Sequence, residues 1–387
     1  MREVVVVGGG PAGAASATFL AQQGVDVLLL ERAMFPRNKP CGEFLTPGTL
    51  RLFRALGVAE TVAAQAQPVR CLLLIAPQGE RVEHQAEGGD EVGFALCRAV
   101  LDALLLNRAR ASGVEVWEGF AVRGVLREEE RVVGVWGIDA RGIRQEIRAH
   151  LVIGADGTHS LVARELDLVR PLPLLQRIAL VSHWPVDTPG DTLEMRVQGG
   201  TVCGMGFPAP RLANVTLVVP RRQAPEVARR GKGAFLEEQI SRLFPDLSRR
   251  LSAGTGPIDV WTIGCFGHRA KQLTADGVLL VGDAATFIDP FTGEGVYLAL
   301  RGAELAGEVA GEALRRGDTR RQSLIAYERR RQELRRRYLL CALIQAIVRS
   351  PGLMNIVVRW LRSHHTVRGR LMKVLGDVSP PEALLKI

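Results

Sequence analysis

The first 31 residues contain the pattern that most restricts how this chain can fold. An apolar run, Val4 to Val7, leads directly into Gly8-x-Gly10-x-x-Gly13, and a second apolar run ends at Glu31. Continuous apolar runs of this length are typical of strands buried in a parallel sheet. The residues between the two runs predict a helix from about Pro11 to Gln22. The segment therefore predicts a strand–helix–strand unit whose first turn is rich in glycine.

Each glycine of this turn has a physical role. Gly8 permits the tight turn, Gly10 lets the backbone approach a pyrophosphate, and Gly13 lets the helix pack closely on the strand. The N–H groups and the dipole at the start of the helix face the phosphates. Glu31 can accept hydrogen bonds from both ribose hydroxyls of an adenosine. The pattern predicts a dinucleotide site and leaves NAD and FAD open; a glycine-rich turn in another α/β protein is the alternative.

Two later motifs also follow predicted strands. LVIGADGTHS, residues 151–160, contains Asp156 and Gly157, and VLLVGDAATFIDPFTGEG, residues 278–295, contains Gly282 and Asp283. With the three motifs in this order and at this spacing, the chain resembles the flavoprotein family that includes aromatic-ring hydroxylases and geranylgeranyl reductases. The resemblance covers about residues 1–330. It implies FAD as the cofactor.

The resemblance also implies roles for single residues. Asp283 would hydrogen-bond the ribityl chain of FAD, with a helix N-cap as the alternative, and Arg98 would reach the phosphates. Asp156 and Gly157 would support the pyrophosphate, and the backbone at Val122 would contact adenine. The expected cofactor contacts are Gly8, Gly10, Pro11, Ala12, Gly13, Glu31, Arg32, Cys41, Gly42, Arg98, Val122, Asp156, Gly157, Gly282, Asp283, Pro290, Gly293, Glu294 and Gly295.

The glycine-rich loop before the helix at Gly295 is expected to take part in the chemistry. Reduced flavin carries negative charge near its N1–C2=O edge, and the N–H groups from Thr292 to Gly295 can stabilise that charge at a helix N-terminus. Gly293 and Gly295 let the backbone come close to a flat ring. We therefore count both glycines among the catalytic candidates.

Details of two segments favour the geranylgeranyl reductase branch of the family. DPFTGEGVYLALRGAELA resembles that branch, and FPRNKPCGE, residues 35–43, resembles its lysine-x-cysteine-glycine motif. Glu43 departs from this pattern, because the reductases typically carry glycine there. In relatives this segment passes beside the isoalloxazine ring, so Cys41 is a catalytic candidate; a small packing residue in a tight loop is the alternative. The tryptophan-rich signature of the halogenase branch is missing.

The middle of the chain has strand character with hairpin turns. We expect an α/β protein with a Rossmann-type FAD-binding domain (residues 1–68, 92–170 and 266–330). An antiparallel-sheet substrate domain (69–91 and 171–265) is inserted into it, and a basic, amphipathic helical region (331–387) follows. His183 and His268 are either proton donors or structural side chains. The candidates for lining a substrate pocket, with core positions as the alternative, are Trp184, Met195, Met205, Phe207 and Trp261.

The net charge of +9 is concentrated in the last part of the chain. Residues 315–387 carry 17 Lys/Arg and 5 Asp/Glu, whereas the first 314 residues carry 33 and 36. A local surplus with few aromatic residues argues against a nucleic-acid partner. The basic helices can lie on an anionic membrane or cap the body of the protein.

The six cysteines are scattered without metal-ligand spacing, so neither structural zinc nor a disulfide framework is predicted. No apolar run is long enough to span a bilayer. We expect a cytoplasmic protein, with peripheral contact to the inner face of the membrane as an open alternative. Its oligomeric state stays open.

The first hypothesis is an FAD-dependent oxidoreductase that acts on a lipophilic substrate of prenyl, quinone or polyketide type through flavin hydride transfer. NAD(P)H or another reductant would donate the electrons. A monooxygenase that hydroxylates an aromatic or polyketide ring is the second hypothesis. A non-catalytic, membrane-associated FAD redox protein is the third.

Overall fold

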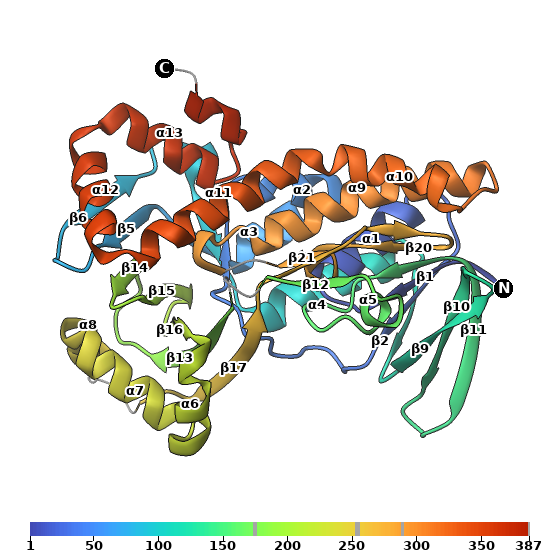
Figure 1. Ribbon diagram of the computed structural model, residues 1–387, viewed down its shortest axis with the longest axis horizontal. Coiled ribbons are helices and arrows are strands. Elements are labelled where there is room, and N and C mark those ends of the chain that lie inside the picture. The colour runs from blue at the N-terminus through green and yellow to red at the C-terminus, as the bar shows by residue number, and fades with distance from the viewer. Residues whose placement is uncertain (173–175, 252–255, 288–289, 386–387) are drawn as a thin grey trace.

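An eight-stranded sheet forms one half of the protein (Figure 1). The computed structural model describes residues 1–172, 176–251, 256–287 and 290–385. The apolar run at the N-terminus forms β1 (Arg2–Val7), which pairs in parallel with β2 (Val27–Glu31) and β11 (Arg144–Gly154). The remaining strands of this sheet are β8 (Glu115–Glu118), β9 (Ala121–Glu128), β10 (Arg131–Ile138), β19 (Thr274–Ala275) and β20 (Val278–Leu280).

Both faces of β1 are buried, which explains why its apolar residues run without interruption. Val4 and Val6 pack in a cluster with residues of α1 (Pro11–Ala21) and α9 (Gly295–Arg315). Val5 and Val7 belong to a second cluster, with Val132 and Val135 of β10. The predicted strand, helix and second strand are confirmed, with Glu31 as the last residue of β2.

A seven-stranded sheet forms the other half, in the order β17-β13-β16-β15-β14-β5-β6. All of its pairs are antiparallel except β14–β5. The predicted turn at Gly199–Gly200 joins β14 to β15, and both glycines have positive φ. The strands are β5 (Cys71–Ile75), β6 (Arg81–Gln85), β13 (Arg177–Pro185), β14 (Thr192–Gln198), β15 (Thr201–Ala209), β16 (Leu212–Pro220) and β17 (Asp259–Phe266).

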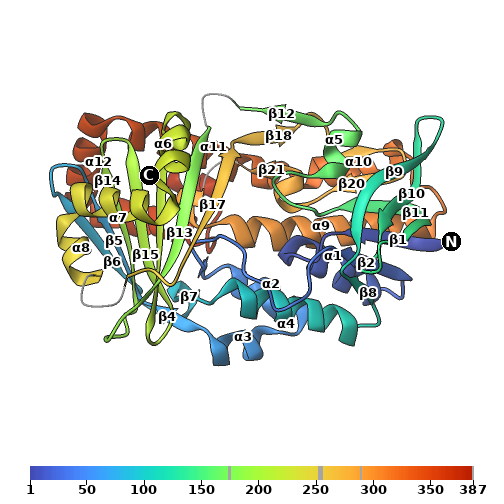
Figure 2. The ribbon, with the colours of Figure 1, turned by 90° about the horizontal axis from the view of Figure 1, so that it is seen from below.

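Helices cover both faces of this second sheet (Figures 1 and 2). On one face lie α6 (Ala224–Arg230), α7 (Lys232–Leu243) and α8 (Pro245–Leu251), whose apolar side chains pack against alternate residues of β13 and β16. Val348 of α11 (Gln332–Arg349) and Val358 of α12 (Pro351–Ser363) pack on the opposite face. Helix α13 (His365–Leu375) follows α12.

Two small sheets connect the halves, in the orders β12-β18-β21 and β3-β7-β4. Their strands are β3 (Phe44–Leu45), β4 (Gln67–Val69), β7 (Gly93–Ala95), β12 (Val169–Pro171), β18 (His268–Ala270) and β21 (Thr286–Phe287). The remaining helices are α2 (Thr49–Leu56), α3 (Ala59–Gln65), α4 (Arg98–Ala111), α5 (Leu161–Glu165) and α10 (Arg321–Arg330). Among the described residues no single helix has both the length and the apolar character of a membrane span, although α11 and α12, bent by 113°, meet these criteria as a pair.

Candidate active site

A cavity lies between the glycine-rich turn at α1 and the seven-stranded sheet. Gly10 and the start of α1 contribute to one side, and residues of β13, β15 and β16, among them Val181, Gly204 and Thr216, form the other. Tyr338 and Cys341 reach it from α11. The predicted cofactor positions that line the cavity are Gly10, Pro11, Ala12, Cys41, Gly42, Arg98, Gly157, Gly282, Asp283, Gly293 and Gly295.

The first turn is shaped for a close ligand. Gly8 has φ +101°, and a Cβ atom on Gly13 would lie 1.9 Å from the carbonyl oxygen of Gly8, so neither position accepts a side chain. At Gly10, by contrast, the nearest atom to a Cβ would be the Arg37 Nη2, at 3.8 Å. The open space beside Gly10 at the N-terminus of α1 is what a pyrophosphate requires. The residues of this turn therefore fit a dinucleotide.

Glu31 forms hydrogen bonds with the backbone of the same turn. Its carboxylate accepts hydrogen bonds from the N–H of Gly9 at 2.7 Å and from the N–H of Ala33 at 2.9 Å, and it is buried. Arg32 is exposed beside it. Val122 lies on β9, where its partner across the ladder is Gly137. Neither Arg32 nor Val122 lines the cavity.

Basic side chains lie near the buried carboxylate of Asp102, beside the cavity. Arg98 donates from Nε and Nη2 to the two oxygens of Asp102, each at 2.8 Å, and Arg37 lies 3.2 Å from the same carboxylate. Lys39 also lines the cavity; burial lowers its pKa, and the charge of Arg98 lowers it further. The three basic side chains outnumber the two nearby carboxylates, Asp102 and Asp283, and create a positive region suited to phosphate.

The second motif holds a loop in place. Asp156 accepts hydrogen bonds from Ser160 Oγ at 2.5 Å and from the N–H groups of Leu161 and Val162, at the start of α5. Burial raises the pKa of this carboxyl group. Asp156 does not line the cavity, whereas Gly157 does. The aspartate therefore fixes the backbone that brings Gly157 to the cavity.

The third motif lines the cavity with backbone. Gly282 and Gly293 have positive φ, and a Cβ atom at these positions would lie 2.6 Å from Ala12 and 2.7 Å from Phe44, respectively. Asp283 lines the cavity, and its carbonyl oxygen lies 2.8 Å from Nε2 of His268. Pro290 begins a short 3-10 turn; its side chain lies outside the described part of the structure.

A buried ionic cluster holds the start of α9. Glu294, the N-cap residue of α9, lies 3.2 Å from Arg337 of α11, and Arg337 lies 2.6 Å from Asp377. Asp377 in turn accepts a hydrogen bond from Thr46 at 2.7 Å. Burial raises the pKa of both carboxyl groups, and the charge of Glu294 raises that of Asp377 further. The sequence did not predict this connection between the loop before α9 and the C-terminal region.

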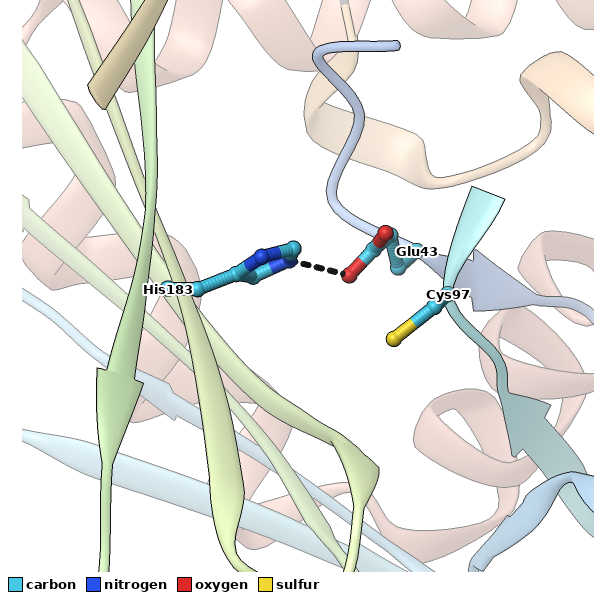
Figure 3. A group of neighbouring side chains, drawn as sticks. All are labelled: Glu43, Cys97 and His183. Carbon is cyan, nitrogen blue, oxygen red and sulfur yellow. Dashed lines mark hydrogen bonds and ion pairs between the residues drawn. The ribbon is translucent and has the colours of Figure 1, made fainter. Parts of the chain in front are cut away.

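Glu43 and His183 belong to a second hydrogen-bonded group (Figure 3). Glu43, just before β3, lies 2.8 Å from Nε2 of His183 and accepts a hydrogen bond from Asn214 Nδ2 at 3.0 Å. Asn214 Nδ2 also donates to the carbonyl oxygen of Cys41, at 2.8 Å. The sequence singled out Cys41 and His183 separately, and Glu43 only as a departure from a motif. Asn214 gave no signal, because an isolated asparagine in a strand carries no pattern.

The predicted pocket residues are divided between two environments. Met195 lines the cavity. Met205 borders the cavity too, but it also packs in the core between the sheet and α6–α8, where Trp184 and Phe207 lie. The ring of Trp261 contacts His183 edge-on, with centroids 5.2 Å apart.

Comparison with known proteins identifies the family. Residues 1–340 match the FAD binding domain family. This chain belongs to that family. The flavoprotein is therefore an FAD-dependent oxidoreductase, and the expected α/β fold with a Rossmann-type FAD-binding part is confirmed.

Curated relatives of the flavoprotein carry the name of one activity. Digeranylgeranylglycerophospholipid reductase 1 from Methanopyrus kandleri is 32% identical over 353 residues, which cover 88% of each chain. The digeranylgeranylglycerophospholipid reductase from Methanospirillum hungatei is 31% identical over 335 residues, 84% of this chain and 80% of the relative.

Solved structures share the fold. A myxobacterial chondrochloren halogenase superposes with a TM-score of 0.81 at 24% identity, covering 89% of the flavoprotein and 82% of the halogenase. A geranylgeranyl bacteriochlorophyll reductase-like protein from Thermoplasma acidophilum gives 0.79 at 24% identity, with 99% and 94% covered. At this identity the likeness describes the fold alone.

Proposed function

We propose that the flavoprotein reduces a carbon–carbon double bond in a long prenyl-type lipid. The observation that carries the proposal is an apolar sheet surface that faces the glycine-rich cofactor loops across one cavity. Apolar side chains of the sheet strands supply this surface, among them Ala179, Val181, Met195, Val218 and Ile263. Such a surface binds hydrocarbon by excluding water. The names of the curated relatives support the same substrate class.

A second pocket that continues the cavity supports a long substrate. A second pocket adjoins the cavity and shares five of its lining residues, which are Phe44, Leu193, Met195, Phe291 and Thr292. Leu72, Leu74 and Leu375 extend its apolar wall. A chain whose double bond lies in the cavity can therefore place its remaining isoprenoid units in the second pocket.

We assign the following roles to residues that line the cavity. The turn at Gly10, with Arg98 and Lys39, holds the phosphates of FAD, and the backbone of Gly293 and Gly295 approaches the ring. FAD, reduced by NAD(P)H or another reductant, supplies a hydride to the substrate. The apolar wall positions the hydrocarbon and keeps water away from the reacting carbon atoms.

We also infer that α11 and α12 rest on an anionic membrane surface. Leu339 and Leu343 are one turn apart on α11, Ile356 and Trp360 are one turn apart on α12, and all four are 46–64% exposed. The positive charge of the C-terminal region complements acidic lipid head groups. A lipid substrate could then enter the cavity next to the membrane from which it comes.

The reduction is tested with the FAD-loaded protein under anaerobic conditions. The flavin is reduced chemically and mixed with a polyprenyl phosphate or a geranylgeranylated lipid, and its reoxidation is followed by absorbance while the product is identified by mass. Substrate-dependent reoxidation with a gain of two hydrogen atoms supports the proposal. If instead the reduced protein consumes oxygen and hydroxylates an aromatic acceptor, the proposal is wrong and the monooxygenase hypothesis replaces it.

Membrane contact is tested by sedimentation with vesicles of phosphatidylglycerol or phosphatidylcholine. The wild type should bind the anionic vesicles, and added salt should weaken binding. The double substitution Leu343→Glu/Ile356→Glu should abolish binding. Ile143→Glu, a change at a residue that is 50% exposed in the turn between β10 and β11, should leave binding unchanged. Equal binding by the double variant contradicts the inference.

A further inference from the structure

We propose that Glu43 and His183 form the proton-handling pair of the cavity, and that Glu43 delivers the proton that completes reduction of the substrate. The inference rests on the proposed function, because adding hydrogen across a double bond needs an acid as well as a hydride donor. Glu43 lines the cavity, whereas His183 stands behind it on β13 (Figure 3). Their side chains meet at 2.8 Å.

The backbone conformation of Glu43 is unfavourable for a residue that has a side chain. Glu43 has φ +57°, in the left-handed region, which costs a residue other than glycine about 1–2 kcal/mol. Its side chain is also buried. Glycine would occupy the position without strain, and glycine is what the reductase motif leads us to expect there. The strain and the burial together indicate that the carboxylate itself is required.

The hydrogen bonds of Glu43 place a proton on its partner. Oε1 accepts the backbone N–H of Arg98 at 2.8 Å, and Oε2 accepts Asn214 Nδ2 at 3.0 Å. A carboxylate can only accept, so the 2.8 Å contact makes Nε2 of His183 a donor. The pair therefore holds a proton between Nε2 and Oε2.

The surroundings of the pair indicate a route for this proton from solvent to the cavity. The side chain of His183 is 11% exposed, and its neighbour across the strand ladder is the exposed Asp259 of β17. Glu43 faces the cavity. A proton can therefore pass from the solvent side through His183 to Glu43, and from Glu43 to the cavity.

Other groups beside the pair do not compete for the proton. Burial raises the pKa of Cys97 to about 12, and the charge of Glu43 contributes, so this thiol stays neutral. Cys41 accepts the N–H of Glu43 at 3.4 Å, and the guanidinium of Arg98 is bound to Asp102. Trp261 covers the ring of His183 without a titratable group.

The ligand atoms of Glu43, Cys97 and His183 lie within 4.8 Å of one another, which is compatible with a metal ion. Three N–H donors already occupy the two oxygens of Glu43, and a cation would have to displace them. We therefore interpret the group as a hydrogen-bonded cluster.

The proton step balances as follows. The π electron pair of the substrate double bond would form a C–H bond to the one proton that His183 Nε2 and Glu43 Oε2 share, and the bond of that proton to the pair would break. The other carbon would accept a hydride, with its electron pair, which reduced FAD would supply as it is oxidised. The pair, now one proton short, would take another proton from the solvent side through His183. The substrate gains one hydride and one proton.

Glu43→Gln keeps the shape of the side chain and removes its acidity. General acid catalysis typically contributes about 10²–10⁴-fold, so substrate-dependent reoxidation of the reduced flavin should slow by that factor. Chemical reduction of the flavin and FAD affinity should stay unchanged. The control is Glu328→Gln, another carboxylate with three donors, two N–H groups and a hydroxyl, but remote from the cavity. It should leave the rate within about twofold of the wild type.

Two further measurements separate proton transfer from a structural role. Formate should restore part of the rate to Glu43→Gly, whose glycine accepts the left-handed backbone and leaves room for the acid. Nitrogen-15 NMR of the holoenzyme should show changed chemical shifts of the His183 ring nitrogens in Glu43→Gln, because Nε2 no longer donates to a carboxylate.

An unchanged reoxidation rate in Glu43→Gln, or no rescue by formate, overturns the inference while leaving the proposed function in place. If the wild type itself is not reoxidised by any prenyl acceptor, the proposed function fails, and the proton-delivery role of Glu43 fails with it.

Discussion

At the scale of single residues, the start of α1 leaves no space for a side chain at Gly13. Gly13→Ala should reduce the free energy of unfolding by about 3 kcal/mol or more and weaken FAD binding, because Cβ would overlap the carbonyl oxygen of Gly8. Gly369→Ala in α13 is the control, since no atom lies within 4 Å of its Cβ. It should raise stability by about 0.5–1 kcal/mol. Urea unfolding and FAD titration measure both; equal effects would contradict the close packing.

Arg98 and Arg316 allow a second comparison between matched ion pairs, each four residues from its acid on one helix. Arg98→Met should cost about 3–5 kcal/mol, because it removes the bidentate partner of the fully buried Asp102. Arg316→Met breaks an exposed pair with Glu312 and should cost about 0.5 kcal/mol or less.

The double variant Arg98→Met/Asp102→Leu separates stability from binding. It should recover most of the stability lost in Arg98→Met, because the buried carboxylate is removed together with its bidentate partner, and Arg37, the other cation beside Asp102, is partly exposed. It should still bind FAD weakly, because the proposed contact between Arg98 and the phosphates is absent. Wild-type FAD affinity in the double variant would contradict the role of Arg98.

At the scale of elements, the cluster of Glu294, Arg337 and Asp377 ties α9, α11 and the segment after α13 together. The folded pKa of Asp377 is raised, chiefly by burial, so folding retains a proton that the unfolded chain releases above about pH 4. The stabilisation from this proton is therefore fully present below about pH 4. It is lost as the pH rises toward the pKa of Asp377 in the folded protein. One such proton changes the unfolding free energy by up to about 1.4 kcal/mol per pH unit.

Asp377→Asn should therefore flatten the decline of stability above about pH 4. Asp318→Asn serves as the control: Arg320 holds the pKa of this half-buried carboxyl group below its usual range, so any contribution is lost only in acid. Urea unfolding at several pH values measures the slopes. An identical slope in wild type and Asp377→Asn would show that Asp377 does not hold the proton.

At the scale of the whole molecule, the cavity depends on contacts between the two sheets. In our proposal FAD binds the loops at Gly10 and Gly293 on the side of the cavity opposite the seven-stranded sheet, so removing it should lower the melting temperature. At a ligand concentration 100 times Kd, bound FAD should add about 2.7 kcal/mol to the unfolding free energy. Calorimetry of the apoprotein with increasing FAD tests this, and a melting temperature independent of FAD would contradict it.

Local patterns determined how much of this architecture was predictable. The β1–α1–β2 unit and the hairpin at Gly199–Gly200 follow from apolar runs and turn glycines, which act within about 20 residues. The contacts of Glu43 with His183 and of Glu294 with Arg337 join residues 140 and 43 positions apart, and no local spacing encodes them. Trp184 shows a third case, because strand character is readable from sequence but the face that meets the helices is not.

The hydrogen bonds between the loop at Thr46–Gly48 and the segment at Gly376–Asp377 also affect the order in which parts of the protein can fold during translation. The N–H of Gly48 donates to the carbonyl oxygen of Gly376 at 2.8 Å, and Thr46 donates to Asp377. A ribosome releases the first of these partners more than 300 residues before the second. The contact between these two segments must therefore wait until translation has passed residue 377. Loading of FAD in the cell should accordingly be completed after synthesis of the last helices.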